Sequence, residues 1–336
     1  MGAFTKRNHY NPCFWTAYWN PEYFAAVTEE RDPPAPARDQ VVFALNLRAD
    51  KVLKAKVREL HYDKGLGVAE ITPDSMMHFS KRWFPSEYGE LEEYIQKNPE
   101  TLYIDFEDTL AGIEEKGGYD ALIEAVKIGG LSSVQHKGFL TCVIVIHALR
   151  SYEMMKSMVE TTSIYGINKW EYFWLLKNAL GNPLVLARAV TPLAFSQWIL
   201  YQTDEHRFPM CDSPVMVREN TLMVVLSPRL LLEINLNFKS PEDHWLHCDR
   251  ISKSKFREFR RRSIMNSFKE IIFHDREELE QWRRLPEYKA RVKALGDSML
   301  AGQLLHEAAN RIIWAIHGFG RVAPDFEKKI RHIFNA

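Results

Sequence analysis

Residues 215–237 read VMVRENTLMVVLSPRLLLEINLN, and this stretch does most to decide the fold class. Apolar and β-branched side chains fill three short runs, Val215–Val217, Leu222–Leu226 and Leu230–Asn237, with a break at Ser227-Pro228. Short apolar runs bounded by turn residues predict β-strands. A further strand is expected immediately upstream, over Phe195–Gln202.

On either side of this stretch, regions with strand patterns alternate with regions with helix patterns. Near the N-terminus, two segments rich in alternating or branched apolar residues predict strands: Val41–Arg48 and Val52–Tyr62. Amphipathic spacing predicts helices from Asp105 to Glu160, including one helix over Gly138–Val159, and another helix over Lys169–Ala179. Helices are expected again from Ser252 onward, three of them after Asp275. Strands, helices, strands and helices in that order predict an α+β fold, with mixed strands in the N-terminal and middle parts around a predominantly helical core.

The composition excludes several classes of function. Lys plus Arg and Asp plus Glu are equal at 44 each, so no net charge attracts nucleic acid or an anionic membrane. The most apolar run, Phe139–Leu149, is too short to cross a bilayer, and the first residues lack the apolar core of a signal peptide. The four cysteines lie far apart, as expected of reduced thiols. We therefore expect a cytoplasmic protein that has no membrane partner. GxxxxGK[ST], GxGxxG, HExxH and GxSxG motifs are absent from the sequence.

Two short motifs carry groups suited to proton or metal chemistry. The first is His9-Tyr10-Asn11-Pro12, where Asn11 and Pro12 predict the N-cap and first residue of an aromatic helix. His9 titrates near neutral pH and can act as an acid, a base or a metal ligand. The second motif is Cys211-Asp212-Ser213-Pro214, where Asp212 either caps a turn or holds a metal ion.

A second group of candidates lies on the predicted helices. His147 and Arg150 are three residues apart and share one face of an apolar helix. A buried Arg150 needs an acidic partner, for which Glu107 and Glu114 are candidates, or it binds a phosphate. Asn266 is either a cap or a site amide. Lys253–Arg262 is the basic cluster of the chain, and it predicts an amphipathic helix with Phe256 and Phe259 inward.

These motifs together resemble the bacterial family called domain of unknown function 4238. The His-Tyr-x-Pro-x-Phe start, Phe106-Glu107, Ile113-Glu114, Arg150-Ser151, Asp212 before Ser-Pro, Leu226-Ser227-Pro228 and the late Asn266 follow its order. The chain departs from the family's pattern at Ala17 and Tyr18, at His147 and at Cys211. The resemblance implies a main α+β domain over residues 1–284, with a helical C-terminal extension over 285–336, and it implies that the shared polar residues meet in one place.

Three hypotheses follow. In the first, the protein is a metal-assisted hydrolase of a phosphodiester or nucleotide, with His9, Asp212 and Glu114 as catalytic groups. Asp212 and Glu107 would hold a divalent metal, while Arg150, His147 and Asn266 would bind the substrate. In the second, it is a non-catalytic module that binds nucleic acid or an anionic ligand through Arg150 and Lys253–Arg262. In the third, the polar residues form a buried network that stabilises the fold.

Overall fold

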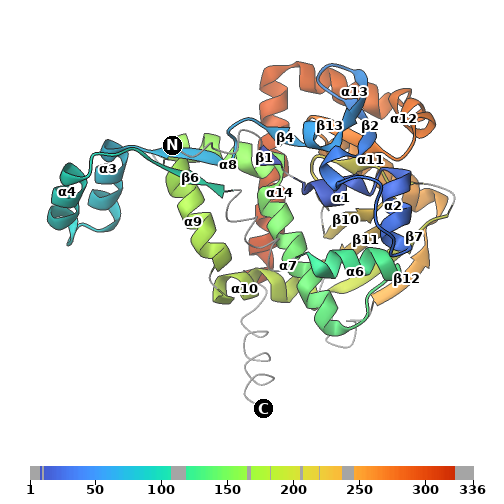
Figure 1. Ribbon diagram of the computed structural model, residues 1–336, viewed down its shortest axis with the longest axis horizontal. Coiled ribbons are helices and arrows are strands. Elements are labelled where there is room, and N and C mark those ends of the chain that lie inside the picture. Colours follow the sequence, from blue (N-terminus) through green and yellow to red (C-terminus); the bar gives the residue numbers. More distant parts are fainter. Residues whose placement is uncertain are drawn as a thin grey trace, which may run out of the picture.

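The computed structural model describes residues 8–9, 11–106, 119–164, 168–181, 183–204, 207–218, 220–236 and 246–321. Helices and strands occur in the predicted mixture, and the α+β class is confirmed (Figure 1). In the described part of the chain, no helix has both the length and the apolar character needed to span a membrane. All four cysteines are free thiols.

The strands predicted between residues 195 and 237 form most of the larger sheet. Its strands are β7 (Gln197–Gln202), β9 (Val215–Arg218), β10 (Thr221–Ser227), β11 (Leu230–Asn235) and β12 (Leu246–Arg250). They lie in the order β12-β7-β11-β10-β9, antiparallel except where β12 runs parallel to β7. Most residues of β9, β10 and β11 are buried, which explains their unbroken apolar runs. The predicted strands of this region are confirmed.

A second sheet joins segments that are far apart in the sequence. It contains β2 (Val41–Asn46), β3 (Lys51–Lys56), β8 (Met210–Cys211) and β13 (Glu270–Phe273), in the order β3-β2-β13-β8. The strand predicted over Val52–Tyr62 is too long, because residues Val57–Glu59 form a 3-10 turn. The chain then forms β4 (Tyr62–Asp63), which pairs with β1 (Asn8–His9).

The helical middle of the chain contains one more break than predicted. Its helices are α6 (Asp120–Ile128), α7 (Val134–Arg150), α8 (Tyr152–Ile164), α9 (Lys169–Gly181) and α10 (Pro183–Ala194). The single helix expected over Gly138–Val159 is therefore wrong. Ser151 adopts φ −56° and ψ 153°, outside the helical region, and its hydroxyl donates to the Ala148 carbonyl at 3.0 Å. A serine hydroxyl competes in this way with the backbone ladder, and the chain turns at that point.

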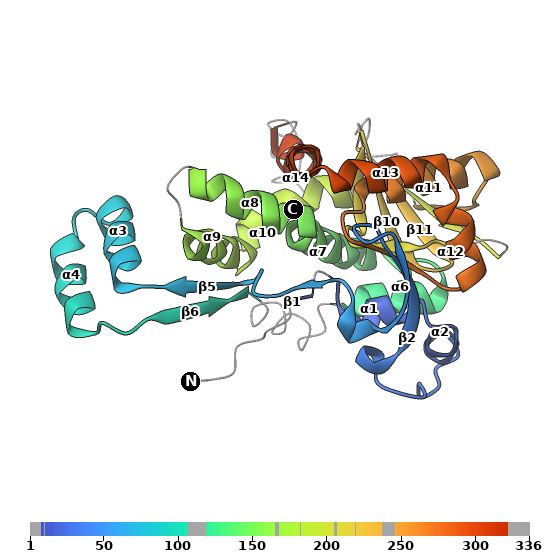
Figure 2. The ribbon, with the colours of Figure 1, turned by 90° about the horizontal axis from the view of Figure 1, so that it is seen from above.

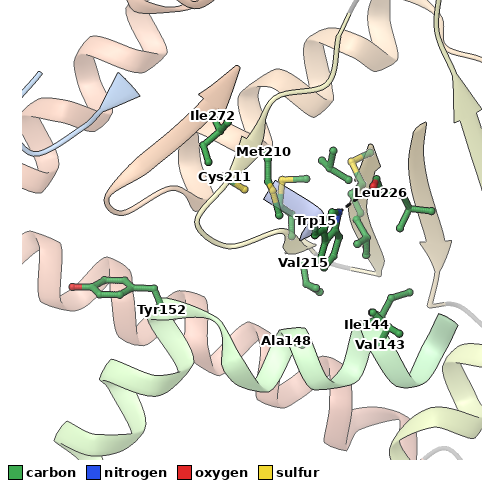
Figure 3. Close-up of a cluster of buried hydrophobic side chains, with 14 of the residues drawn as sticks. Trp15, Val143, Ile144, Ala148, Tyr152, Met210, Cys211, Val215, Leu226 and Ile272 are labelled. Carbon is green, nitrogen blue, oxygen red and sulfur yellow. Dashed lines mark hydrogen bonds between the residues drawn. The ribbon is translucent and has the colours of Figure 1, made fainter. Parts of the chain in front are cut away.

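Two short helices anchor the N-terminal part of the chain, α1 (Cys13–Ala17) and α2 (Pro21–Thr28). The indole Nε1 of Trp15 donates to the Leu226 carbonyl at 3.0 Å, and Trp15 lies among buried side chains of both sheets and α7 (Figure 3). The Nε1 of Trp19 donates to the Phe208 carbonyl at 2.7 Å. The prediction that Asn11 caps α1 is wrong, because the N-cap position belongs to Pro12 and no side chain caps the helix.

The C-terminal helices are α11 (Lys253–Asn266), α12 (Arg276–Arg283), α13 (Pro286–Gly296) and α14 (Ser298–Arg321). The predicted helices after Asp275 are thus present in the described chain. Helix α14 contacts α8 and α10, and α13 contacts α11. The Ser157 hydroxyl and the His306 ring lie 2.7 Å apart across one of these contacts. Hydrogen bonds therefore cross the predicted boundary at residue 284, and the boundary itself stays a prediction.

A slender arm projects from the main body. A two-stranded ribbon of β5 (Val68–Ile71) and β6 (Leu102–Asp105) leads to a hairpin of α3 (Pro73–Trp83) and α4 (Tyr88–Lys97). In Figures 1 and 2 this hairpin occupies one end of the molecule, and α12 lies toward the opposite end.

Candidate functional site

Asp212 lies in a fully buried turn directly after β8. Its carboxylate accepts the backbone N–H of Phe268 at 3.1 Å and that of Lys269 at 2.5 Å, so it holds the loop between α11 and β13. Burial raises the pKa of Asp212 to about 6, although these hydrogen bonds and the Lys269 charge act in the opposite direction. This contact differs from the local turn cap that the sequence left open for Asp212, because its two N–H partners lie 56 and 57 residues further along the chain.

A second carboxyl, Glu153, lies beside Asp212. It belongs to the first turn of α8, is 1% exposed, and accepts a hydrogen bond from the Ser213 hydroxyl. Burial raises its pKa to about 8, so Glu153 is mostly protonated at neutral pH. Sequence reasoning missed Glu153. Its spacing of three residues from Arg150 was a usable signal, but the break at Ser151 separates the two residues onto different helices.

The third member of this buried group is Arg291 of α13, which sequence reasoning also missed. Its Nε donates to the Ser267 carbonyl at 2.9 Å, and its guanidinium lies 4.5 Å from the centroid of the Phe268 ring. Within the described ranges its two terminal nitrogens have no hydrogen-bond partner. Burial lowers the pKa of Arg291 to about 10, while the charges of Asp212 and Glu153 act to raise it. We call Asp212, Ser213, Glu153 and Arg291 the polar core.

The two motifs singled out in the sequence meet beside the polar core. The Asn11 amide donates to the Cys211 carbonyl at 3.3 Å, and it lies 2.8 Å from Nδ1 of His61. The backbone N–H of His61 donates to the Glu270 carboxylate at 2.8 Å. His61 has φ 51°, a left-handed conformation that is uncommon outside glycine and that these contacts hold in place. Asn11 therefore provides the contact between the first and second motifs, for which the sequence had suggested His9.

The three predicted substrate-binding residues are all buried. His147 is fully buried on α7, with its ring 4.6 Å from the Trp15 ring and 5.3 Å from the Tyr119 ring. Arg150 is buried at the last residue of α7. Asn266 ends α11, and its amide donates to the Arg262 carbonyl of the same helix at 2.8 Å. In this structure the amide of Asn266 acts as a local cap.

The remaining predicted residues are only partly placed. The backbone of His9 pairs with Tyr62, which brings β1 close to Lys269, since the Lys269 ammonium donates to the Tyr62 carbonyl at 2.7 Å. The side chain of His9 lies outside what the structure describes, as do Glu107 and Glu114. Among the residues that are described, no group of three or more His, Cys, Asp or Glu side chains is arranged to hold a metal. The predicted metal role of Asp212 and Glu107 stays a prediction.

The polar core combines an ionised and a protonated carboxyl at neutral pH, the pairing that acid–base chemistry requires. However, Asp212 and Ser213 are fully buried, and Arg291 is 2% exposed. In this enclosed state Glu153 contacts Ser213, whereas Asp212 and Arg291 contact backbone groups of the loop before β13, and all four side chains are almost fully shielded from solvent. The geometry therefore gives the polar core a direct role in holding α8, α13 and the turn after β8 together.

An open cleft lies elsewhere, between α11 and α12. It has a volume of about 770 Å³, within the size range of small-ligand sites. Lys253, Arg257 and Arg260 of α11 line one wall at helical spacing, and Arg207 contributes a fourth cation. The predicted amphipathic helix is confirmed, because Phe259 is fully buried on its inner side.

Acidic side chains from the start of α12 line the other wall of this cleft. They are Asp275, Glu277 and Glu278. Burial, and then the charge of Asp275, raises the pKa of Glu278 to about 8, so that this side chain is mostly neutral at pH 7. Four cations therefore face two charged carboxylates. Burial lowers the pKa of His274, which precedes Asp275 in the chain; the charges of Arg207 and Arg229 act in the same direction and that of Asp275 opposes them.

Comparisons with known proteins add nothing to this geometry: no family model, no curated protein and no solved structure matches the chain. The resemblance to domain of unknown function 4238 stays a prediction.

Proposed function

We propose that this protein binds a small anionic ligand in the cleft between α11 and α12, without catalysing a reaction on it. The observation that carries the proposal is the shared orientation of Lys253, Arg257 and Arg260, which line one cleft together with Arg207. Two other cations of the same helix are already paired within the protein. Lys255 contacts Glu233 at 2.8 Å, and Arg262 contacts Glu258 at 2.5 Å.

The acidic wall favours a compact ligand over a nucleic acid. A polynucleotide places regularly spaced phosphates along its contact surface, and Asp275 and Glu277 would repel them. A short anion can contact α11 alone, and a hydroxyl or amine on the same ligand could donate to the carboxylates of α12.

The test uses inorganic pyrophosphate as the probe and isothermal titration calorimetry as the measurement. Wild-type protein should bind, with affinity that decreases as salt is added. R257E should weaken binding at least about tenfold, because a charge-assisted hydrogen bond is worth ~1.5–3 kcal/mol and 1.4 kcal/mol corresponds to a factor of ten.

Arg261 provides the matched control for this experiment. It is the exposed neighbour of Arg260 on the same helix and does not line the cleft. R261E makes the same change in net charge and should leave the affinity within about twofold. Equal loss in R257E and R261E, or no binding of pyrophosphate by the wild type, would contradict the proposal.

A second candidate function, the metal-assisted hydrolase, is favoured by the polar core. The pKa values of Asp212 and Glu153, about 6 and about 8, place one base and one acid side by side at neutral pH. If the enclosed core opens to substrate, D212N should abolish hydrolysis of a nucleotide or phosphodiester in the presence of Mg²⁺ or Mn²⁺, while circular dichroism remains that of the wild type. Unchanged hydrolysis by D212N would exclude this role.

A further inference from the structure

The tip of the arm exposes large apolar side chains. Trp83 is 51% exposed, Phe84 40% and Tyr94 64%. Over α3 and α4 only Ser80 and Ile95 are buried. Several large apolar side chains exposed on one small element are a feature of interaction sites.

The hairpin buries too few side chains to be stable by itself. A two-stranded ribbon is marginally stable by itself, and β5 and β6 make no larger sheet in the described chain. Helix α9 supports only the base of the arm: the Trp170 indole donates to the Ser75 hydroxyl at 3.0 Å, and the Trp170 ring lies 4.8 Å from the Phe79 ring. Trp83 and Tyr94 take no part in these two contacts, while the Phe84 ring lies 5.8 Å from the Phe79 ring.

The charges of the two helices are opposite in sign. Helix α3 ends with the exposed cations Lys81 and Arg82, whereas α4 carries Glu90, Glu92 and Glu93, of which Glu93 is paired with Lys97 of the same helix at 2.5 Å. A surface with one basic and one acidic helix is complementary to a second copy of itself turned by a two-fold rotation. In that arrangement each α3 faces the α4 of the other copy, as symmetric dimers require.

We propose that the α3–α4 hairpin is a dimerisation element, and that its occupant is the same hairpin of a second copy of this chain. The two hairpins form a four-helix assembly in which Trp83, Phe84 and Tyr94 become buried. The cations of each α3 contact the glutamates of the partner's α4. Helices α11 and α12, which line the cleft, lie toward the opposite end of each molecule (Figure 2), so the cleft stays open in the dimer.

The decisive experiment reverses the charges of one helix at a time. In the K81E/R82E variant both helices are acidic, and in the E90K/E93K variant both are basic. Each variant alone should be monomeric by sedimentation velocity at concentrations up to about 100 µM, where the wild type is dimeric. An equimolar mixture of the two variants should form a heterodimer, because each basic helix then faces an acidic one.

A second pair of variants tests the apolar contact. Y94D should shift the wild-type dimer to monomer, while M299D should not, although Met299 at the start of α14 is even more exposed at 72%. Circular dichroism checks that the variants keep their helix content. A wild type that is monomeric at about 100 µM, or a mixture of the charge variants that stays monomeric, would overturn the proposal. Pyrophosphate binding is independent of both outcomes.

Discussion

Burial changes the chemistry of individual side chains in this protein more than charge pairing does. Removal from water raises the pKa of Glu153 and Asp212 and lowers that of Arg291, and in each case it is the largest cause. A carboxyl whose pKa is raised in the folded state holds a proton that the unfolded chain releases. Its contribution to stability is therefore complete below the unfolded pKa and is lost as the pH rises through the folded pKa.

This linkage predicts that the protein loses stability between about pH 4.5 and about pH 8, the ordinary and the folded pKa of Glu153. E153Q keeps a neutral side chain of the same shape and should remove the share of that loss due to Glu153, at most about 1.4 kcal/mol per pH unit. Glu278, whose pKa is also raised to about 8, contributes a further share over the same window. Urea unfolding at about pH 5 and about pH 8.5 measures the difference. Asp212 accounts for a remaining decrease between its ordinary value of 3.8 and about 6. A variant with the full wild-type slope would contradict the assignment.

At the scale of elements, the short helix α1 has a larger role than its five residues suggest. Its length is too small for stability by itself, so its position depends on Trp15 and on the adjacent Trp19. Their indoles bond carbonyls 211 and 189 residues away along the chain. Helix α1 thus connects the first residues of the chain to the central region.

W15F tests this role of α1. The substitution keeps an aromatic ring but leaves the buried Leu226 carbonyl without its donor, which should cost about 1–3 kcal/mol in the free energy of unfolding. W174F on α9 is the control, because Trp174 is 38% exposed. Its effect should stay within about 0.5 kcal/mol. Equal losses in the two variants, measured by urea unfolding, would show that Trp15 has no special anchoring role.

Two places in the chain show that a local sequence pattern is not sufficient to predict the structure. The apolar spacing over Gly138–Val159 is compatible with one helix, and no proline or glycine marks the break between α7 and α8. The turn at Ser151 is stabilised by contacts that only the folded chain makes, among them the packing of α8 against α14. Asn11 illustrates the same limit, since Asn before Pro is typical of a helix start, yet its amide bonds Cys211.

At the scale of the whole molecule, the two proposed activities lie toward opposite ends. Figures 1 and 2 place the α3–α4 hairpin at one end and α12 toward the other. A dimer joined through the hairpins would therefore present two separate α11–α12 clefts, directed away from each other. Ligand binding and self-association are then expected to be independent. Titration of pyrophosphate into the wild type and into Y94D tests this, because the two affinities should be equal. The polar core lies on neither of these surfaces and contributes to stability.

The sequence by itself determined the α+β class, the strands around residues 197–235 and the amphipathic α11. Each depends on local periodicity, which is a property of a short stretch of chain. The tertiary structure alone decided that Asp212 caps the loop before β13, that Glu153 and Arg291 join Asp212, that Asn11 contacts the second motif, and that Arg207 lines the cleft beside α11. These residues are tens to hundreds of positions apart, and their contacts depend on how the chain brings its apolar faces together.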